Sequence, residues 1–297
     1  MLLSILIPAY SYPEGVVRIL QSASKGISPE VEILIFDDSP NDKVETSVSE
    51  CGESLTNVRY VHNRPALGAA NNWNALLDTA KGEYCLLMHH DEFPIGDCFV
   101  MDLVTTLCEH PETDVAMLDC VLTELESGLN RRHLPTFIRV LVVNYFPQYL
   151  YRRNVIGPTA ALVIRRSIYP RFDARLQWLV DVDVYVRLLW VAKHLRFCPN
   201  IQIGSMQGRS DTITARLGSS IPRMAKEERT YLREQYPHNT LWLGPYPQEH
   251  LVYGLLRAFE TLCWWSIRAL TRLAVCIYLC PVPRSKVQRA VYGRRVP

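Results

Sequence analysis

Apolar runs of strand length alternate with amphipathic segments over the first 125 residues of the chain. Each run is rich in Val, Ile, Leu and aromatic residues, which is typical of buried β-strands. The runs are residues 4–10, 31–39, 57–63, 84–92 and 114–122. Apolar residues recur at helical spacing in three intervening segments, which are residues 14–25, 69–80 and 97–109. Nearly continuous apolar strands separated by helices predict a mostly parallel, doubly wound α/β sheet with both faces covered.

The pattern changes in the second half of the chain. Residues 127–156 are predicted to form an irregular, basic insertion around the apolar segment 137–146. Four further elements are predicted after it: a turn and strand over 157–166, a helix over 179–195, a strand over 196–205 and a polar helix over 222–235. The acids of the predicted helix 179–195 lie in its first turn, which is where the helix dipole favours them.

These elements predict one Rossmann-type layered domain over residues 1–215. Residues 1–125 and 126–215 are expected to form its two halves. The remaining residues, 216–297, are predicted to be a helical C-terminal appendage.

The appendage carries an unusual combination of residues. Its segment 248–280 has helical periodicity, scattered arginines and the pair Trp264 and Trp265, and a basic stretch follows. Such a segment suits an amphipathic helix that lies on an anionic membrane surface. The alternative is a helical hairpin that packs on the preceding domain.

The composition is that of a folded protein, but its charges are unevenly distributed. Hydrophobic residues make up 48% and charged residues 21% of the 297 positions, which excludes a largely disordered chain. Residues 1–130 contain 6 Lys and Arg against 21 Asp and Glu, whereas residues 131–250 contain 18 against 8. An acidic first half does not bind a phosphate group unaided, so such a ligand would need a divalent cation there. No nucleic-acid partner is predicted.

The cysteines and the N-terminus indicate a cytoplasmic protein. The nine cysteines are odd in number, irregularly spaced and without a C-x-x-C pair, so neither a disulfide framework nor a zinc site is expected. The N-terminal run lacks a basic region and reads as a first strand rather than a signal peptide. No window of about twenty residues is free of charge, so no transmembrane span is expected.

Polar side chains follow three of the predicted strands, at the point where each strand ends. Tyr10 follows the first run, Asp37 and Asp38 end the second, and His89 to Glu92 end the fourth. The carboxyl ends of parallel strands lie at one edge of a sheet, where ligands bind in doubly wound folds. The sequence therefore predicts a ligand site at this edge.

Six segments occur in an order and at spacings that match one known family. They are SILIPAY (4–10), IFDDSPND (35–42), HNRPALGAANNWNALLDTAKGEY (62–84), LLMHHDEF (86–93), GPTAALVIRR (157–166) and FDARLQWLVDVDVYVRL (172–188). Through them the chain resembles the family-2 glycosyltransferases of the GT-A fold, over roughly residues 3–215.

This resemblance implies an inverting glycosyltransferase. The donor would be a nucleotide-diphospho-sugar, with UDP or dTDP preferred to GDP, and the acceptor a hydroxyl of a saccharide or glycolipid. The resemblance also implies assembly of a surface polysaccharide or glycolipid by a peripheral enzyme on the cytosolic face of the membrane.

The resemblance assigns the nucleoside part of the donor to four positions near the strand ends. Asp38 matches the carboxylate that binds the nucleoside, Asp37 precedes it, and Pro8 and Tyr10 would form the opposite wall of the base pocket. The alternative is that the two aspartates cap a turn before Pro40.

Two asparagines bracket the start of the predicted helix 69–80. Asn71 and Asn74 are placed near the donor by the resemblance, because the amides of a helix N-terminus bind phosphate. Capping of the helix by asparagine is the alternative reading.

A divalent cation, Mn²⁺ or Mg²⁺, is implied by the segment LLMHHDEF. Asp91 matches the last Asp of the family's D-x-D element, which ligates the ion bound to the donor diphosphate. His89 stands where the first Asp is usual, and imidazole suits Mn²⁺ better than Mg²⁺. His90 is assigned to the donor site. For both histidines, a strand-end side chain that bonds its neighbours is the alternative.

The general base implied by the resemblance is Asp181, with Asp183 close by to orient the acceptor or Arg187. Val180 departs from the Glu that is common there. The alternative for both aspartates is favourable charge at a helix N-terminus. Arg209 stands near a position where relatives often have a His, and it is expected to pair with the diphosphate.

Two other classes of function remain to be weighed. The departures at His89, Val180 and Arg209 keep open a catalytically inactive relative that binds a nucleotide or a partner. A nucleotidyltransferase would need a Gly-rich, basic phosphate loop after the first strand, and AYSYPEGVVR is not such a loop.

Overall fold

The structure is a computed structural model that describes residues 1–25, 28–51, 57–134, 136–145, 147–209 and 213–236, together with Ala258 and Leu262. The chain divides into two compact units, Met1–Gly244 and Pro245–Pro297. The predicted aromatic and basic tail, with Trp264 and Trp265, lies outside the described residues, and the predicted boundary after residue 215 stays a prediction. Among the helices that are described, none has the length and apolar character needed to cross a bilayer.

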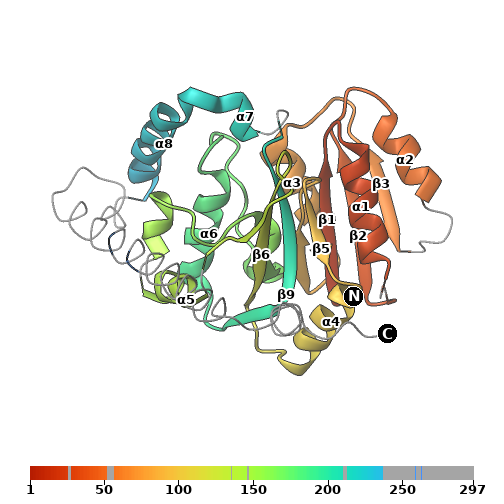
Figure 1. The fold of residues 1–297 in the computed structure, drawn as a ribbon, viewed down its shortest axis with the longest axis horizontal. Coiled ribbons are helices and arrows are strands. Elements are labelled where there is room, and N and C mark those ends of the chain that lie inside the picture. The colour runs from red at the N-terminus through yellow and green to blue at the C-terminus, as the bar shows by residue number, and fades with distance from the viewer. Residues whose placement is uncertain are drawn as a thin grey trace, which may run out of the picture. The chain divides into compact units, whose positions relative to one another are not determined.

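The first unit is built on one mixed sheet, drawn in Figure 1. Its strands are β1 (Leu3–Ala9), β2 (Val31–Asp37), β3 (Val58–His62), β4 (Tyr84–Leu87), β5 (Glu92–Ile95), β6 (Val115–Glu124), β7 (Asn130–Arg132), β8 (Leu162–Arg165) and β9 (Leu195–Gln207). The strand order is β3-β2-β1-β4-β8-β6-β9-β5, and β7 pairs with β6. Strands β3, β2, β1, β4, β6 and β9 share one direction, whereas β8, β5 and β7 run against it. The predicted α/β fold with a mostly parallel central sheet is confirmed.

Helices of the first half connect and cover the strands. The described α-helices are α1 (Pro13–Ala23), α2 (Lys43–Cys51), α3 (Ala69–Thr79), α4 (Phe99–Glu109), α5 (Thr136–Tyr145), α6 (Val180–Val191), α7 (Ile213–Leu217) and α8 (Ile221–Gln235). Every residue of β1 and β2 is buried, so neither face of these strands meets water. Alternate residues of both strands pack with α1, α2 and α4 in one core cluster, while α3 contacts the same two strands separately.

The structure corrects the expected strand over residues 84–92. Strand β4 ends at Leu87, and a tight turn follows in which the Glu92 N–H donates to the His89 carbonyl at 2.9 Å. The chain then enters β5, which pairs antiparallel with β9 at the edge of the sheet. An edge strand tolerates Pro94, which has no N–H to donate. His89, His90 and Asp91 therefore lie in a turn between β4 and β5, and not along a single strand.

The segment predicted to be an irregular insertion contains a helix, α5. Its buried residues Ile138, Val142 and Val143 recur at helical spacing. The Arg139 side chain is also buried, and it lies 3.5 Å from the Asp119 carboxylate and donates to the Leu118 carbonyl at 2.8 Å. Arg139 can be buried against β6 because the Asp119 carboxylate balances its charge and the Leu118 carbonyl accepts a hydrogen bond from it.

Tyr231 of α8 contacts two residues of the segment before α6. The Tyr231 hydroxyl donates to Asp173 at 2.6 Å, and the Arg175 guanidinium lies over the Tyr231 ring, 4.6 Å from its centroid. The pKa of Asp173 falls to about 2, because hydrogen bonds from Arg175 and Tyr231 outweigh the opposing effect of burial. Figure 1 shows α8 and α6 together on the β6 side of the sheet, away from α1 and α2.

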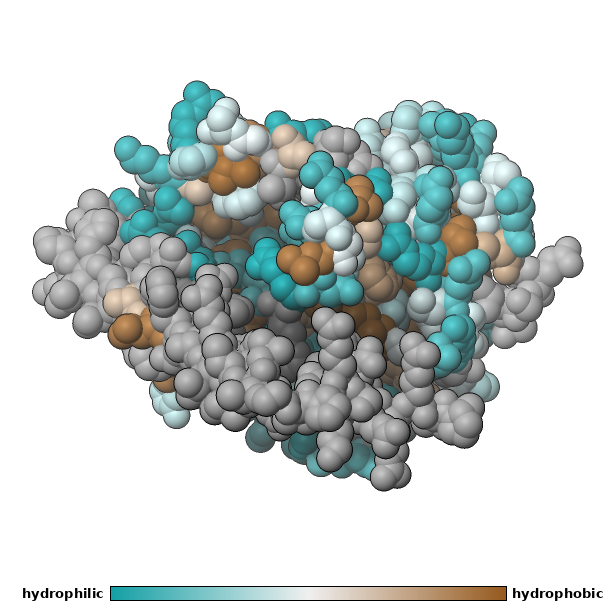
Figure 2. Space-filling view, in the orientation of Figure 1, coloured by the Kyte–Doolittle hydropathy of each residue, from teal (hydrophilic) through white to brown (hydrophobic). Residues whose placement is uncertain are grey.

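The described surface is largely polar. Figure 2 shows hydrophilic residues interspersed with small apolar groups over the face turned to the viewer. Single exposed apolar side chains such as Met101 and Tyr145 are ordinary on soluble domains and carry no functional argument.

Gly15 lets α1 approach the turn after β4. A methyl group built on Gly15 would lie 2.0 Å from the His90 carbonyl oxygen and 2.4 Å from the Tyr12 ring. Backbone cannot yield as a flexible side chain would, so Gly15→Ala should lower the free energy of unfolding by about 1–3 kcal/mol. Gln21→Ala, at an exposed position of the same helix, is the control and should change it by less than about 0.5 kcal/mol. Urea denaturation measures both; equal midpoints for the two variants would contradict this packing.

Candidate active site

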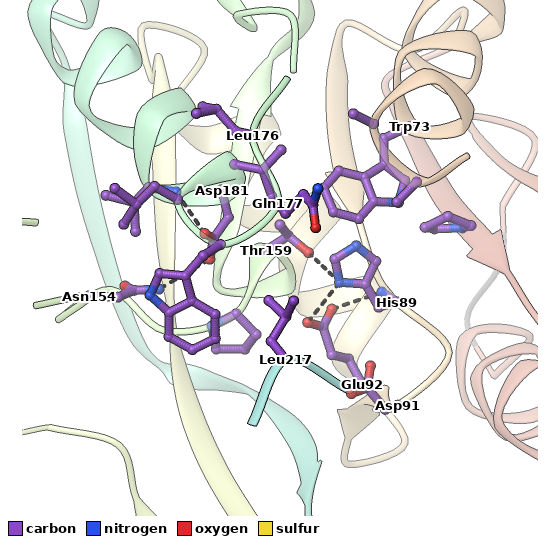
Figure 3. Close-up of a pocket in the computed structure, with 18 of the residues that line it drawn as sticks. Trp73, His89, Asp91, Glu92, Asn154, Thr159, Leu176, Gln177, Asp181 and Leu217 are labelled. Atoms are coloured by element: carbon purple, nitrogen blue, oxygen red, sulfur yellow. Dashed lines mark hydrogen bonds and ion pairs between the residues drawn. The ribbon is translucent and has the colours of Figure 1, made fainter. Parts of the chain in front are cut away.

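One large cavity, with a volume of about 1430 Å³, lies at the carboxyl ends of the parallel strands. Asp38, Asp91 and Asp181, which come from three distant parts of the chain, all line it. Predicted residues Pro8, Tyr10, Asn71, His89 and His90 also line it. Figure 3 shows Asp181 and Asn154 on one side of this cavity and Trp73, His89, Glu92 and Asp91 on the other. The structure therefore brings together most of the predicted site.

Asp38 holds the loop that leads into α3. Its carboxylate accepts hydrogen bonds from Asn63 Nδ2 at 2.8 Å, from the Leu67 N–H at 3.1 Å and from the Gly68 N–H at 2.8 Å. Gly68 has φ +79°, a left-handed conformation that suits glycine at the start of this helix. Asp38 thus fixes the N-terminal turn of α3, whose residues from Gly68 to Trp73 line the cavity.

Tyr10 and Asp38 also border a second, smaller cavity of about 340 Å³. Its other walls include His62, Arg64 and Pro65. The Tyr10 side chain is 44% exposed, and the guanidinium of Arg216 lies 5.8 Å from the centroid of its ring. A flat, accessible ring beside a carboxylate is suited to a planar ligand with N–H donors.

His89, Asp91 and Glu92 form a compact group in the turn after β4, with ligand atoms that all lie within 4.8 Å of one another. His89 Nδ1 lies 3.4 Å from Glu92 Oε1 and 3.2 Å from the Thr159 hydroxyl, and Glu92 Oε2 accepts the His89 N–H at 2.8 Å. Burial alone would lower the pKa of His89, but the carboxylates of Glu92, Asp91 and Asp181 raise it above the usual value. Burial raises the pKa of Glu92.

This group fits a divalent cation. His89 Nε2 is buried and has no hydrogen-bond partner among the described residues, and Asp91 has a carboxylate on the cavity wall. A mixed set of carboxylate and imidazole donors suits Mn²⁺ better than Mg²⁺. The neighbouring His90 is in a different environment: its ring packs edge-on against Tyr12 at 5.7 Å, and burial lowers its pKa.

Asp181 lies at the first turn of α6. Its Oδ1 accepts the Val182 N–H at 2.8 Å, and its Oδ2 accepts a hydrogen bond from Asn154 Nδ2 at 3.2 Å. Burial raises the pKa of Asp181 to about 6, against opposing effects of the Val182 amide and of His89. A carboxylate with a pKa of about 6 holds a proton more readily than an exposed aspartate and is still ionised at neutral pH.

Glu228 of α8 fixes the backbone of residues 177–179, which directly precede α6 and Asp181. Its buried carboxylate accepts the backbone N–H groups of Gln177 at 2.7 Å, Trp178 at 3.1 Å and Leu179 at 2.7 Å. Three successive amides that converge on one anion form a strong binding nest. Gln177, Trp178 and Leu179 line the cavity directly before α6, so Glu228 fixes both this wall and the start of the helix.

Four predicted residues are not among those that line the cavity. The Asp37 carboxylate is fully buried and bonds the Ser39 N–H and hydroxyl and the Tyr60 hydroxyl. Asn74 bonds both the N–H and the carbonyl of Phe172. These two side chains hold backbone segments together.

Asp183 and Arg209 are the other two. Asp183 is fully buried and forms an ion pair with Arg187 at 2.5 Å. Orienting Arg187 was one of the two roles that the sequence analysis gave to Asp183. The Arg209 guanidinium lies over the Tyr12 ring, 3.3 Å from its centroid. Neither residue contributes to the cavity wall.

Sequence reasoning missed three residues of the site: Asn154, Thr159 and Glu228. Asn154 also accepts the Ile156 and Gly157 N–H groups at 3.0 Å, so the run Asn-Val-Ile-Gly was a readable turn signal. Thr159 lies in the segment GPTAALVIRR, but nothing local in the sequence indicates its contact with His89 or that of Glu228 with Gln177, because these partners are 70 and 51 residues away.

The fold places a large cavity at the carboxyl ends of its parallel strands, and comparison with known proteins identifies the family. The model of glycosyl transferase family 2 matches residues 4–172, and the chain belongs to this family. It is 24% identical, over 209 residues, to the uncharacterized protein MT1568 of Mycobacterium tuberculosis; the match covers 63% of this chain and 62% of that protein.

Solved structures share the fold at low sequence identity. The crystal structure of S. aureus TarS 1–349 in complex with UDP-GlcNAc has a TM-score of 0.59 and 14% identity, covering 86% of this chain and 79% of that one. The mannosyltransferase PcManGT from Pyrobaculum calidifontis, in complex with GDP-Man and Mn²⁺, has a TM-score of 0.53 and 14% identity, covering 97% and 78%. Both similarities concern the fold.

Replacement of Glu228 by Gln tests the hydrogen bonds that fix residues 177–179. A glutamine amide has one acceptor oxygen and turns N–H donors toward backbone N–H groups, so the free energy of unfolding should fall by about 2–4 kcal/mol. Turnover by the folded enzyme should fall about tenfold or more, because Asp181 is displaced, while donor KM stays unchanged.

The matched control is Glu227→Gln, one residue earlier on α8, where the exposed carboxylate only pairs with Arg223. It should leave stability and turnover unchanged. A Glu228→Gln enzyme that is less stable but keeps full turnover below its melting temperature would show a purely structural role, and Glu228→Asp should restore part of the loss.

Proposed function

We propose that the protein is an inverting glycosyltransferase that transfers a sugar from a nucleotide-diphospho-sugar to a hydroxyl of a saccharide or glycolipid. The observation that carries this proposal is the convergence of Asp38, Asp91 and Asp181 on one cavity. The complexes of the structural neighbours with UDP-GlcNAc and with GDP-Man and Mn²⁺ support a nucleotide-sugar donor. UDP or dTDP is proposed in preference to GDP.

The donor is assigned to the wall formed by β1, β2 and α3. Tyr10 offers a ring face to the base, and Asp38 borders both cavities where the nucleoside would lie. Asp91 and His89 would hold a divalent cation, which offsets the charge that develops on the leaving diphosphate when it is bound. The acidic wall would otherwise repel that diphosphate.

The acceptor is assigned to the wall that carries Asp181. The Asp181 carboxylate takes the proton from the acceptor hydroxyl as the hydroxyl oxygen attacks the anomeric carbon. The bond from that carbon to the diphosphate oxygen breaks on the opposite face and the nucleoside diphosphate leaves, so the configuration inverts. The Asn154 amide orients the carboxylate through its hydrogen bond, and the raised pKa strengthens the base. A lipid-linked acceptor on the cytosolic face of the membrane is part of the proposal.

A donor panel tests the proposed function directly. Turnover of UDP-, dTDP- and GDP-linked sugars with Mn²⁺ should show one productive donor, and the same donor should raise the melting temperature. Binding at a hundredfold excess over Kd adds about 2.7 kcal/mol of stability. Binding of a nucleotide without transfer to any acceptor pool would instead identify an inactive relative.

Asp181→Asn should lower kcat by at least about a hundredfold, because the variant lacks a proton acceptor. In the wild-type enzyme, kcat/KM should rise with pH through about 6 and then level off, since only the ionised carboxylate acts as base. Asp102→Asn, an exposed aspartate of α4, is the control and should keep full activity. A variant with more than half of the wild-type turnover, or a profile flat from pH 5 to pH 8, would refute this role.

Asp91→Ala should abolish the dependence of donor affinity on Mn²⁺. Calorimetric titration of the nucleoside diphosphate, with Mn²⁺ and with EDTA, should show tighter binding with the ion for the wild type and no difference for the variant. Asp97→Asn, whose exposed carboxylate pairs with Lys25, is the control. If the wild type binds equally with and without the ion, the metal role is wrong.

A further inference from the structure

The acceptor wall of the cavity is basic. Arg152, Arg153 and Arg229 all line the cavity and are partly exposed. The opposite wall is acidic, with Asp38, Asp91 and Glu92. The acidic residues come from the first half of the sequence and the arginines from the second half, so the uneven charge of the sequence becomes an uneven charge around one cavity.

Hydrogen bonds connect the backbone segment of Arg152 and Arg153 to both Asp181 and α8. Arg152 and Arg153 directly precede Asn154, whose amide donates to the Asp181 carboxylate at 3.2 Å. The Arg229 guanidinium donates to the carbonyl of Tyr151, the residue before Arg152, at 3.5 Å. Two elements distant in the sequence thus bring cationic side chains to the same stretch of wall.

The donor does not account for these cations. The Arg216 guanidinium lies near the Tyr10 ring, on the donor side, and the cation group of His89, Asp91 and Glu92 serves the diphosphate. Arg152, Arg153 and Arg229 line the same cavity as the proposed base, Asp181, and none of them belongs to the elements assigned to the donor. Each of the three already has a polar, charged or ring contact within the protein, so an anionic ligand would join or replace such a contact.

The same wall offers contacts to a sugar ring and to apolar groups. Trp178 lines the cavity three residues before Asp181, and an indole face packs well on the C–H groups of a sugar. Apolar side chains line the same cavity: Leu150, Leu176, Leu179, Leu217, Pro222 and Ala225. A ligand that is part sugar, part anion and part apolar would match this wall.

We propose that Arg152, Arg153 and Arg229 form a subsite for a phosphate group of the acceptor, in the same cavity as the base Asp181. The proposal rests on the proposed function and names its acceptor class, a phosphorylated saccharide. Guanidinium groups bind phosphate in bidentate fashion, and three of them suit a phosphodiester or diphosphate better than a single carboxylate. The phosphate could belong to a lipid-diphosphate-linked sugar or to a soluble sugar phosphate.

Kinetics with matched acceptors test this subsite. Three acceptors with the same sugar are compared: a short polyprenyl-diphosphate-linked sugar, the corresponding sugar phosphate and the neutral octyl glycoside. The phosphorylated acceptors should have a KM at least about tenfold below that of the octyl glycoside. A further advantage of the lipid-linked form would identify the lipid as the source of the phosphate; equal KM values for it and the sugar phosphate would identify a soluble acceptor.

The variants Arg153→Gln and Arg229→Gln should each raise the KM of the phosphorylated acceptors about tenfold, with donor KM unchanged. Arg223→Gln, at an exposed position of α8 outside the cavity, is the matched control. Arginine variants that raise donor KM instead would assign these side chains to the donor and overturn the proposal. An octyl glycoside that is used as well as its phosphorylated counterparts would overturn it too.

A binding measurement separates this proposal from the proposed function. Inorganic pyrophosphate is titrated calorimetrically into the full chain with EDTA present, so that a divalent cation does not contribute. Arg153→Gln and Arg229→Gln should each weaken binding about tenfold, and Arg223→Gln should not. If no donor is turned over but this pattern holds, the transferase role fails and the phosphate subsite stands. If the arginine variants bind pyrophosphate like the wild type, the subsite is wrong.

Discussion

Buried carboxylates that accept backbone N–H groups hold the cavity in shape. Asp38 binds the Leu67 and Gly68 amides, Glu92 binds the His89 amide, and Glu228 binds three successive amides before α6. Hydrogen bonds between an anion and amides are stronger than neutral ones, and a buried anion without them would be costly. Loops that would otherwise sample many conformations are therefore fixed where they border the ligand space, which is what precise positioning of reacting groups requires.

The two walls of the cavity differ in charge. In the proposed function, Asp38, Asp91 and Glu92 on the donor wall create a negative environment that a nucleoside diphosphate would enter together with a cation. On the wall proposed for the acceptor, burial raises the pKa of Asp181 to about 6, and Arg152, Arg153 and Arg229 line the same cavity. A transfer reaction with anionic groups on both substrates would need such a division of charge within one space.

Much of this arrangement followed from the sequence, and the physical reason is local. Strands β1, β2 and β4 are apolar runs that end in polar residues, so parallel pairing brings Tyr10, Asp38 and Asp91 to one edge. The position of β8 between β4 and β6, antiparallel to both, depends on pairing between segments far apart in the chain. Helix α2 was not predicted, because only Val44 and Val48 are buried on it and its apolar periodicity is therefore weak. Long-range partners such as Glu228 carry no local signal at all.

The hydrogen bonds between Glu228 and the segment before α6 bear on how much of the chain is needed to form the cavity. The family match ends at residue 172, before α6, and Glu228 lies more than fifty residues beyond that limit. A truncated protein that stopped after β9 would retain every strand of the described sheet and the loops at the strand ends, yet lose the Glu228 carboxylate that fixes the start of α6. Residues beyond the family match therefore help to shape the cavity, and comparisons between members need to extend through α8.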